Sequence, residues 1–151
     1  MILAFIIILA LPAVLLSYWQ EDKNSKICFK NNCYFAEIVR TQAEKEKGLM
    51  YRKNLDKKQG MLFINNEEKI YPFWMKNMRF PLDIIWLDNN LEVVFVAKNA
   101  QPCGEGECNN IIPNKPARYI LEINSGEADR IGLKQGDRFH YETRFQKIFE
   151  N

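Results

Sequence analysis

The distribution of charge along the sequence constrains the fold more than any other feature. The first 20 residues, Met1 to Gln20, contain no aspartate, glutamate, lysine or arginine, and 17 of them are apolar. All 21 basic and all 19 acidic residues therefore lie in the rest of the 151-residue chain. That remainder has the size of one ordinary domain, and it is too apolar and too aromatic for a disordered segment. We expect one hydrophobic leader joined to one compact domain.

The leader, residues 1–20, is expected to be a signal peptide or an uncleaved membrane anchor. Ile2 to Trp19 supplies eighteen uncharged residues, which is close to the lower limit for a helix that crosses a bilayer. The basic front end of a signal peptide is missing, and Tyr18 and Trp19 stand where interfacial aromatic residues anchor a span. We therefore expect a chain held in the cell membrane and facing outward, or a secreted one if the leader is cleaved. A buried helix is the alternative.

The four cysteines form two pairs with equal spacing, Cys28 with Cys33 and Cys103 with Cys108. Each pair encloses four turn-prone residues, so each could close a local disulfide in an oxidising compartment. Four cysteines allow three pairings, and a four-thiolate zinc site or free thiols are alternatives. Neither pair is Cys-x-x-Cys, which disfavours redox catalysis. Two disulfides are the preferred interpretation.

The charged part of the chain has the pattern of about seven short strands and two short helices. Strands are expected at 33–40, 60–64, 73–76, 82–87, 91–97, 119–123 and 138–143. A capping box from Thr41 to Glu44 begins one helix, and Asn124 with Glu127 begins the other. The turn at residues 88–90 predicts a hairpin between the strands on either side of it. The pattern indicates a single α+β, β-rich domain, barrel-like or sandwich-like.

Several motifs stand in a characteristic order and spacing. They are Gly60–Phe63, Phe73–Asn77 with Pro81–Asp88, Tyr119–Gly126, Asn99–Cys103 and Gly132–Arg138. Together they resemble the domain-of-unknown-function family 192 over about residues 34–143. The resemblance implies a compact β-rich domain, commonly bacterial or archaeal and often behind a signal or anchor, and it brings no established activity, ligand or catalytic residue. We accordingly divide the chain into the leader at 1–20, a tether carrying the first cysteine pair at 21–33, and a family-192-like domain at 34–148.

The segment Phe73 to Asn77 is the densest mixture of aromatic and polar groups in the chain. On an extended backbone, Phe73, Met75 and Asn77 face one side. Trp74 and Lys76 then face the other, where they could offer a stacking surface and a cation to an anionic or aromatic ligand. In the alternative arrangement, Trp74 fills the core and Lys76 reaches water past it.

Three further charged residues are candidates for a binding site. Asp83 interrupts the apolar run at 81–87, so its carboxylate must be paired, with Lys76 or Arg118, or open to a ligand at the end of the sheet. Arg118 and Glu122 share a strand face and could line the same concavity as Lys76, although a solvated strand face is the alternative. The candidate ligand-binding residues are therefore Trp74, Lys76, Asn77, Asp83, Arg118 and Glu122.

Composition narrows the possible functions. A formal net charge of +2 does not favour nucleic acid as a partner. The single histidine, His140, cannot build a histidine-rich metal site, and no nucleophile elbow or phosphate-binding glycine loop is present. We expect no metal and no cofactor, and an extracytoplasmic module that binds a small ligand, a glycan or an envelope protein. The alternatives are a cell-envelope hydrolase that pairs Asp83 with Glu122 or Asp88, and a structural domain without a pocket.

Overall fold

The structure of the chain is a computed structural model that describes residues 24–104 and 106–142; the predicted leader lies outside them. The elements are β1 (Asn24–Phe29), β2 (Asn32–Val39), α2 (Gln42–Lys47), β3 (Gln59–Lys69), β4 (Leu82–Leu87), β5 (Val93–Ala100), β6 (Ala117–Asn124), α3 (Glu127–Arg130) and β7 (His140–Glu142). In these described ranges, no helix combines the length and the apolar character that a membrane span needs.

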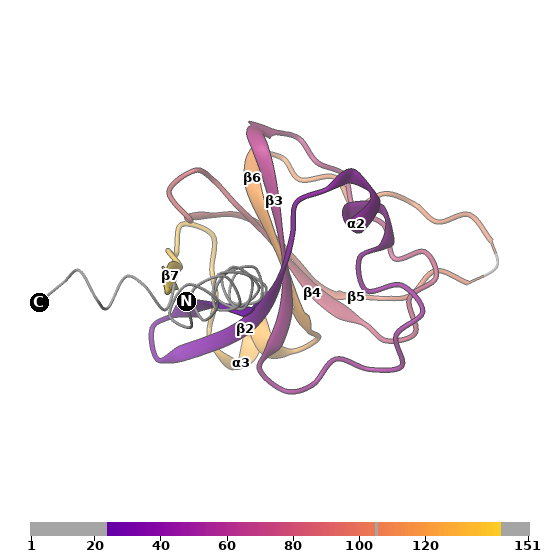
Figure 1. Ribbon diagram of the computed structural model, residues 1–151, viewed down its shortest axis with the longest axis horizontal. Coiled ribbons are helices and arrows are strands. Elements are labelled where there is room, and N and C mark those ends of the chain that lie inside the picture. The colour runs from indigo at the N-terminus through magenta and orange to yellow at the C-terminus, as the bar shows by residue number, and fades with distance from the viewer. Residues whose placement is uncertain (1–23, 105, 143–151) are drawn as a thin grey trace, which may run out of the picture.

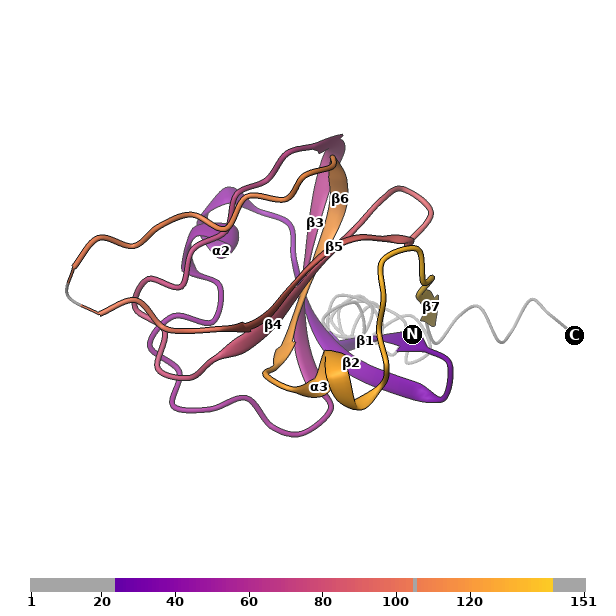
Figure 2. The same ribbon diagram turned by 180° about the vertical axis from the view of Figure 1, so that it is seen from behind.

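The strands form one mixed sheet in the order β5-β4-β6-β3-β2-β1-β7. The β2–β3 pair is parallel, and the other neighbouring strands are antiparallel. The sheet is strongly twisted but not closed into a barrel, and α2 and α3 lie on opposite sides of the molecule (Figures 1 and 2). The predicted β-rich α+β class with two short helices is thus confirmed for the described residues.

The central strands are buried on both faces, which explains their continuous apolar sequences. All six residues of β4 are buried. One face of the sheet packs with Leu121 and Ile123 against α3 and the chain that follows it. The other face packs with Ile120 and Trp86 against the loop after α2 and the aromatic segment at 71–80. The sheet therefore separates two apolar clusters, and α2 stands beside the second.

Part of the segment predicted as a tether, residues 21–33, forms β1. Ile27 and Phe29 are buried in the first apolar cluster, because β1 pairs along its whole length with β2. The strand begins with three polar residues, Asn24 to Lys26, so its sequence does not show the pattern of a buried strand. The folded domain therefore begins before residue 34.

The strand predicted at 73–76 is replaced by a loop that is extended only at its start. Phe73 forms an isolated bridge with Ile111. The chain then turns, with Met78 N donating to Met75 O at 3.4 Å. The aromatic segment is therefore a loop that packs beside the sheet rather than a strand within it.

The two helices begin in different ways. The predicted capping box at Thr41–Glu44 is present at α2. The first residue of α3 follows Gly126, which has a φ of 85° and makes no side-chain cap. Asp83 of β4 supplies that cap, since its Oδ2 accepts from Ala128 N at 2.7 Å. Asn124, predicted to begin this helix, instead donates to backbone carbonyls of the loop before β3.

Both predicted disulfides are present in the structure. Cys28 and Cys33 lie directly opposite each other on β1 and β2, and Cys103 and Cys108 close a loop after β5. No cysteine among the described residues is free. The four cysteines are therefore arranged as the two local pairs of the preferred interpretation.

Candidate functional site

A cavity of about 580 Å³ lies between α2 and the aromatic segment. Its walls come from α2 and the residues just after it, and from the segment Tyr71–Met78. Phe63 and Asn65 of β3 and Glu122 of β6 also line it, and Asn110 adds a polar side chain from the long loop after β5. Its size lies in the range of small-molecule sites, and aromatic side chains line it together with polar and charged ones.

Glu122 is the most unusual residue of this cavity. It lies opposite Met61 and Ile84 in the sheet, so its side chain points into the second apolar cluster. It is 5% exposed, and its Oε2 has no hydrogen-bond partner among the described residues. Burial raises the pKa of this carboxyl to about 8, an effect that Arg52 partly opposes. The side chain is therefore mostly protonated at neutral pH, where it can donate a hydrogen bond.

Arg52, whose charge opposes the rise in the pKa of Glu122, is paired with another carboxylate. Its Nη1 and Nη2 donate to Oε1 and Oε2 of Glu37 at 2.5 and 2.7 Å. This bidentate geometry is the strongest form of arginine–carboxylate pairing. The charge of Arg52 therefore offsets the burial of the Glu122 carboxyl only in part.

Two lysines of the cavity are held in different ways. Lys45 of α2 donates to Asn65 Oδ1 at 2.7 Å, and partial burial lowers its pKa. Lys76 Nζ lies 5.9 Å from the centroid of the Trp74 ring, and that ring is 47% exposed. The core-filling alternative for Trp74 is therefore wrong. The structure presents an aromatic surface and a cation side by side at the cavity.

Phe73 and Asn77 fix the position of the aromatic segment. Phe73 packs edge-on against Phe63 and Trp86, with ring centroids 4.9 and 5.6 Å apart. Asn77 does not line the cavity, but its Nδ2 donates to the Tyr51 hydroxyl at 2.7 Å and its carbonyl accepts from Tyr51 N at 3.0 Å. Together these contacts hold the two walls of the cavity at a defined separation.

The disulfide-closed loop supports the same wall. Cys103 N donates to Met75 O at 3.1 Å, and Ile111 pairs with Phe73 in both directions, at 2.7 and 3.0 Å. Asn110, next to Ile111, lines the cavity. The second cysteine pair therefore stabilises a loop that is part of the candidate site.

Asp83 lies away from the cavity. It is opposite Ile123 in the sheet, so it points to the face opposite that of Glu122. Its partners are neither Lys76 nor Arg118, since Oδ1 accepts from Asn99 N at 2.8 Å and Oδ2 from Ala128 N. The structure thus supports an anchoring role, and Asp83 and Glu122 cannot face each other across one cleft.

Arg118 and Asp88 also do not line the cavity, although Arg118 is hydrogen-bonded to Asn65, which does. Arg118 Nε donates to Asn65 O at 3.1 Å, and its Nη1 donates to Asn89 Oδ1 at 3.2 Å. Asp88 Oδ1 accepts from the backbone of Asn90 and Glu92 in the hairpin turn. Of the six predicted ligand-binding residues, the cavity therefore brings together Trp74, Lys76 and Glu122.

The comparisons with known proteins agree with this fold. The model of the DUF192 family, described as "Uncharacterized ACR", matches residues 26–141, and the chain belongs to this family. No curated protein matches it. It is similar to a protein of unknown function from Novosphingobium aromaticivorans, with 35% identity, a TM-score of 0.69, and coverage of 78% of this chain and 83% of that one. It is also similar to a Sinorhizobium meliloti protein described as a "putative transcription regulator", with 29% identity, a TM-score of 0.70, and coverage of 78% and 92%.

Proposed function

We propose that this chain binds a small anionic ligand with a ring-shaped body, an acidic sugar unit of a glycan being the class that fits best. The observation that carries the proposal is the buried carboxyl of Glu122, whose Oε2 has no hydrogen-bond partner among the described residues, in the same cavity as an exposed Trp74 with Lys76 beside it. A buried polar group without a partner is costly to keep in a fold. A ligand that accepts its hydrogen bond removes that cost.

The residues of the cavity offer complementary interactions to such a ligand. Lys45, Lys47 and Lys76 line it, and Glu46 is the only carboxylate besides the protonated Glu122 among the described residues of its lining. This excess of positive charge favours an anionic ligand. The exposed face of Trp74 suits the apolar face of a sugar ring, because an indole combines a large apolar surface with a polar edge. The protonated Glu122 then donates to a ligand oxygen at the floor.

Calorimetric titration of the full-length chain with a uronate oligosaccharide, and with its neutral counterpart, tests this function. We expect binding of the acidic sugar alone. Lys76→Ala should weaken it about tenfold or more, because a hydrogen bond to a charged group contributes about 1.5–3 kcal/mol. Trp74→Ala should also weaken it, because it removes the aromatic surface that the sugar ring stacks on. Lys134→Ala, an exposed lysine outside the cavity, is the matched control and should change nothing. Undiminished binding by both cavity variants, or binding of neither sugar, would contradict the proposal.

A cell-envelope hydrolase is the second candidate function, and Glu122 is the observation that favours it. A carboxyl with a pKa of about 8 can act as a general acid at neutral pH, and Glu46 supplies a second carboxylate to the same cavity. Release of new reducing ends from the uronate oligosaccharide, lost in Glu122→Gln, would support hydrolysis. Binding of the oligosaccharide without release of reducing ends would contradict hydrolysis and support a binding function alone.

The proposal includes a location outside the cytoplasm, on the membrane or secreted. The uncharged leader at 1–20 supports export, and so do the two disulfides, because such bonds persist in oxidising compartments. Protease treatment of intact cells that carry a tag at the end of the chain checks this. Complete protection of the tag, with reduced cysteines in the soluble fraction, would contradict it.

A further inference from the structure

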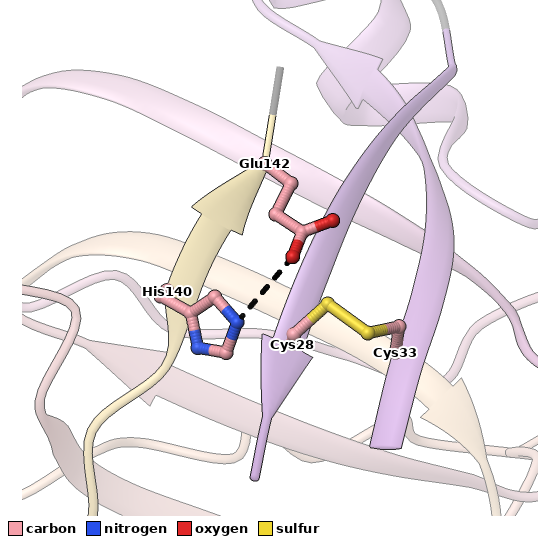
Figure 3. Close-up of a disulfide and its surroundings, with 4 residues drawn as sticks. All are labelled: Cys28, Cys33, His140 and Glu142. Carbon is pink, nitrogen blue, oxygen red and sulfur yellow. Dashed lines mark ion pairs between the residues drawn. A yellow bond between two sulfur atoms is a disulfide. The ribbon is translucent and has the colours of Figure 1, made fainter. Parts of the chain in front are cut away.

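The three strands at one edge of the sheet bring together four side chains that can bind a metal. Cys28 of β1 lies directly opposite Cys33 of β2 on one side and opposite His140 of β7 on the other. Glu142 follows two residues after His140, so it points to the same face of the sheet. Figure 3 shows His140 and Glu142 directed towards the Cys28–Cys33 disulfide.

These donor atoms are close enough to share one ion. The sulfur of Cys28, a ring nitrogen of His140 and a carboxylate oxygen of Glu142 all lie within 4.8 Å of one another. His140 Nε2 is 3.8 Å from Glu142 Oε1. Both side chains are about half exposed, whereas Cys28 is fully buried. The cluster is therefore open to solvent on the β7 side and closed on the sulfur side.

We propose that reduction of the Cys28–Cys33 disulfide creates a zinc site made of both cysteine thiolates, His140 and Glu142. A two-electron reductant such as a dithiol breaks the S–S bond, gives a proton to each sulfur and becomes a disulfide itself. On binding Zn²⁺, the two thiols release these protons to solvent and form two Zn–S bonds. Two sulfurs, one imidazole and one carboxylate are donors that tetrahedral Zn²⁺ accepts in proteins.

The sheet holds these ligands in place when the disulfide opens. Tetrahedral Zn²⁺ with Zn–S bonds of about 2.3 Å places two sulfurs about 3.8 Å apart. The Cα atoms of Cys28 and Cys33 are 4.0 Å apart, and backbone pairing of β1 with both neighbours does not depend on the S–S bond. Side-chain rotation alone can therefore provide the required sulfur separation. The same four residues would be a disulfide in an oxidising compartment and a zinc site in a reducing one.

Cobalt titration of the full-length chain in mild detergent tests the inference. The chain carries Cys103→Ser and Cys108→Ser, so that only one cysteine pair remains, and excess reductant is removed without air. We expect the reduced chain to bind one Co²⁺ with thiolate-to-cobalt charge-transfer absorption, and one Zn²⁺ to displace it. The oxidised chain should show no such band. A reduced chain without the band would overturn the proposal.

Substitution of the β7 ligands separates a four-ligand site from binding by thiols alone. His140→Ala and Glu142→Gln should each weaken the affinity for Co²⁺ at least tenfold, since loss of even an outer-shell partner costs about 10–100-fold. Arg138→Ala, two residues earlier in the chain and exposed, is the matched control. Circular dichroism verifies that each variant keeps its sheet. Equal affinity of the parent chain, His140→Ala and Glu142→Gln would refute the site.

Discussion

The Asp83→Asn substitution is expected to lower the free energy of unfolding by about 2–4 kcal/mol. Asp83 is 1% exposed, and its two carboxylate oxygens accept from Asn99 N and Ala128 N at 2.8 and 2.7 Å. An asparagine side chain has only one acceptor oxygen. Its amide group would face a backbone N–H, so one hydrogen bond is lost and two donors oppose each other in a buried place.

Urea unfolding of the parent chain and the variant measures this loss. Asp88→Asn is the matched control, because Asp88 also accepts from two backbone amides, those of Asn90 and Glu92, but in a turn that water reaches. We expect the control to cost about 1 kcal/mol or less. Equal losses in the two variants would contradict the anchoring role. A stable Asp83→Asn chain that has lost ligand binding would instead restore Asp83 to the binding site.

The anchoring role of Asp83 illustrates which parts of this fold can be predicted from sequence. The hairpin at 82–97 and the capping box at Thr41–Glu44 are encoded within a few neighbouring residues, and both are present. The cap of α3 is not local, because Asp83 precedes Ala128 by 45 residues. The local pattern at Asn124 predicts a side-chain cap that the structure does not use.

The candidate site could also be predicted only where it depends on local sequence patterns. Alternation along the aromatic segment correctly separates half-buried Phe73 and buried Met75 from exposed Trp74 and Lys76, although the segment is a loop. The Arg52–Glu37 pair was missed, because it joins β2 to the loop before β3 and neither residue lies in a distinctive motif. Only the folded structure shows that Arg52 is paired with Glu37.

The burial of Glu122 is the property of the site that is hardest to predict from the local sequence. A glutamate near the end of an apolar strand is usually solvated, and the strand face it shares with Arg118 has the pattern of a solvated edge. β6 is instead a central strand between β3 and β4, so both of its faces are covered. The covering groups come from α2 and the aromatic segment, which are distant in sequence and meet only in the cavity.

The Glu122→Gln substitution is expected to raise the free energy of unfolding at high pH. The free energy of unfolding of the parent chain falls as pH rises, and the variant should lose much of this pH dependence. The pKa of Glu122 is about 8 in the folded chain, against 4.5 for an exposed carboxyl. Between these values the folded state binds more protons than the unfolded state, so the free energy of unfolding falls as pH rises. Glu122 has no such cost below pH 4.5, and above pH 8 the cost reaches at most about 5 kcal/mol. Glutamine keeps the shape and stays neutral throughout.

Urea unfolding of the parent and the variant at several pH values from 5 to about 9 measures the effect. The difference between the two chains isolates Glu122, because all other titrating groups are common to both. Glu46→Gln is the matched control, since it removes an exposed glutamate of the same cavity; it should leave the slope of stability against pH close to that of the parent. Parallel pH curves for the parent and Glu122→Gln would mean that the buried carboxyl is ionised and solvated. The hydrogen-bond donor assigned to the floor of the cavity would then not exist.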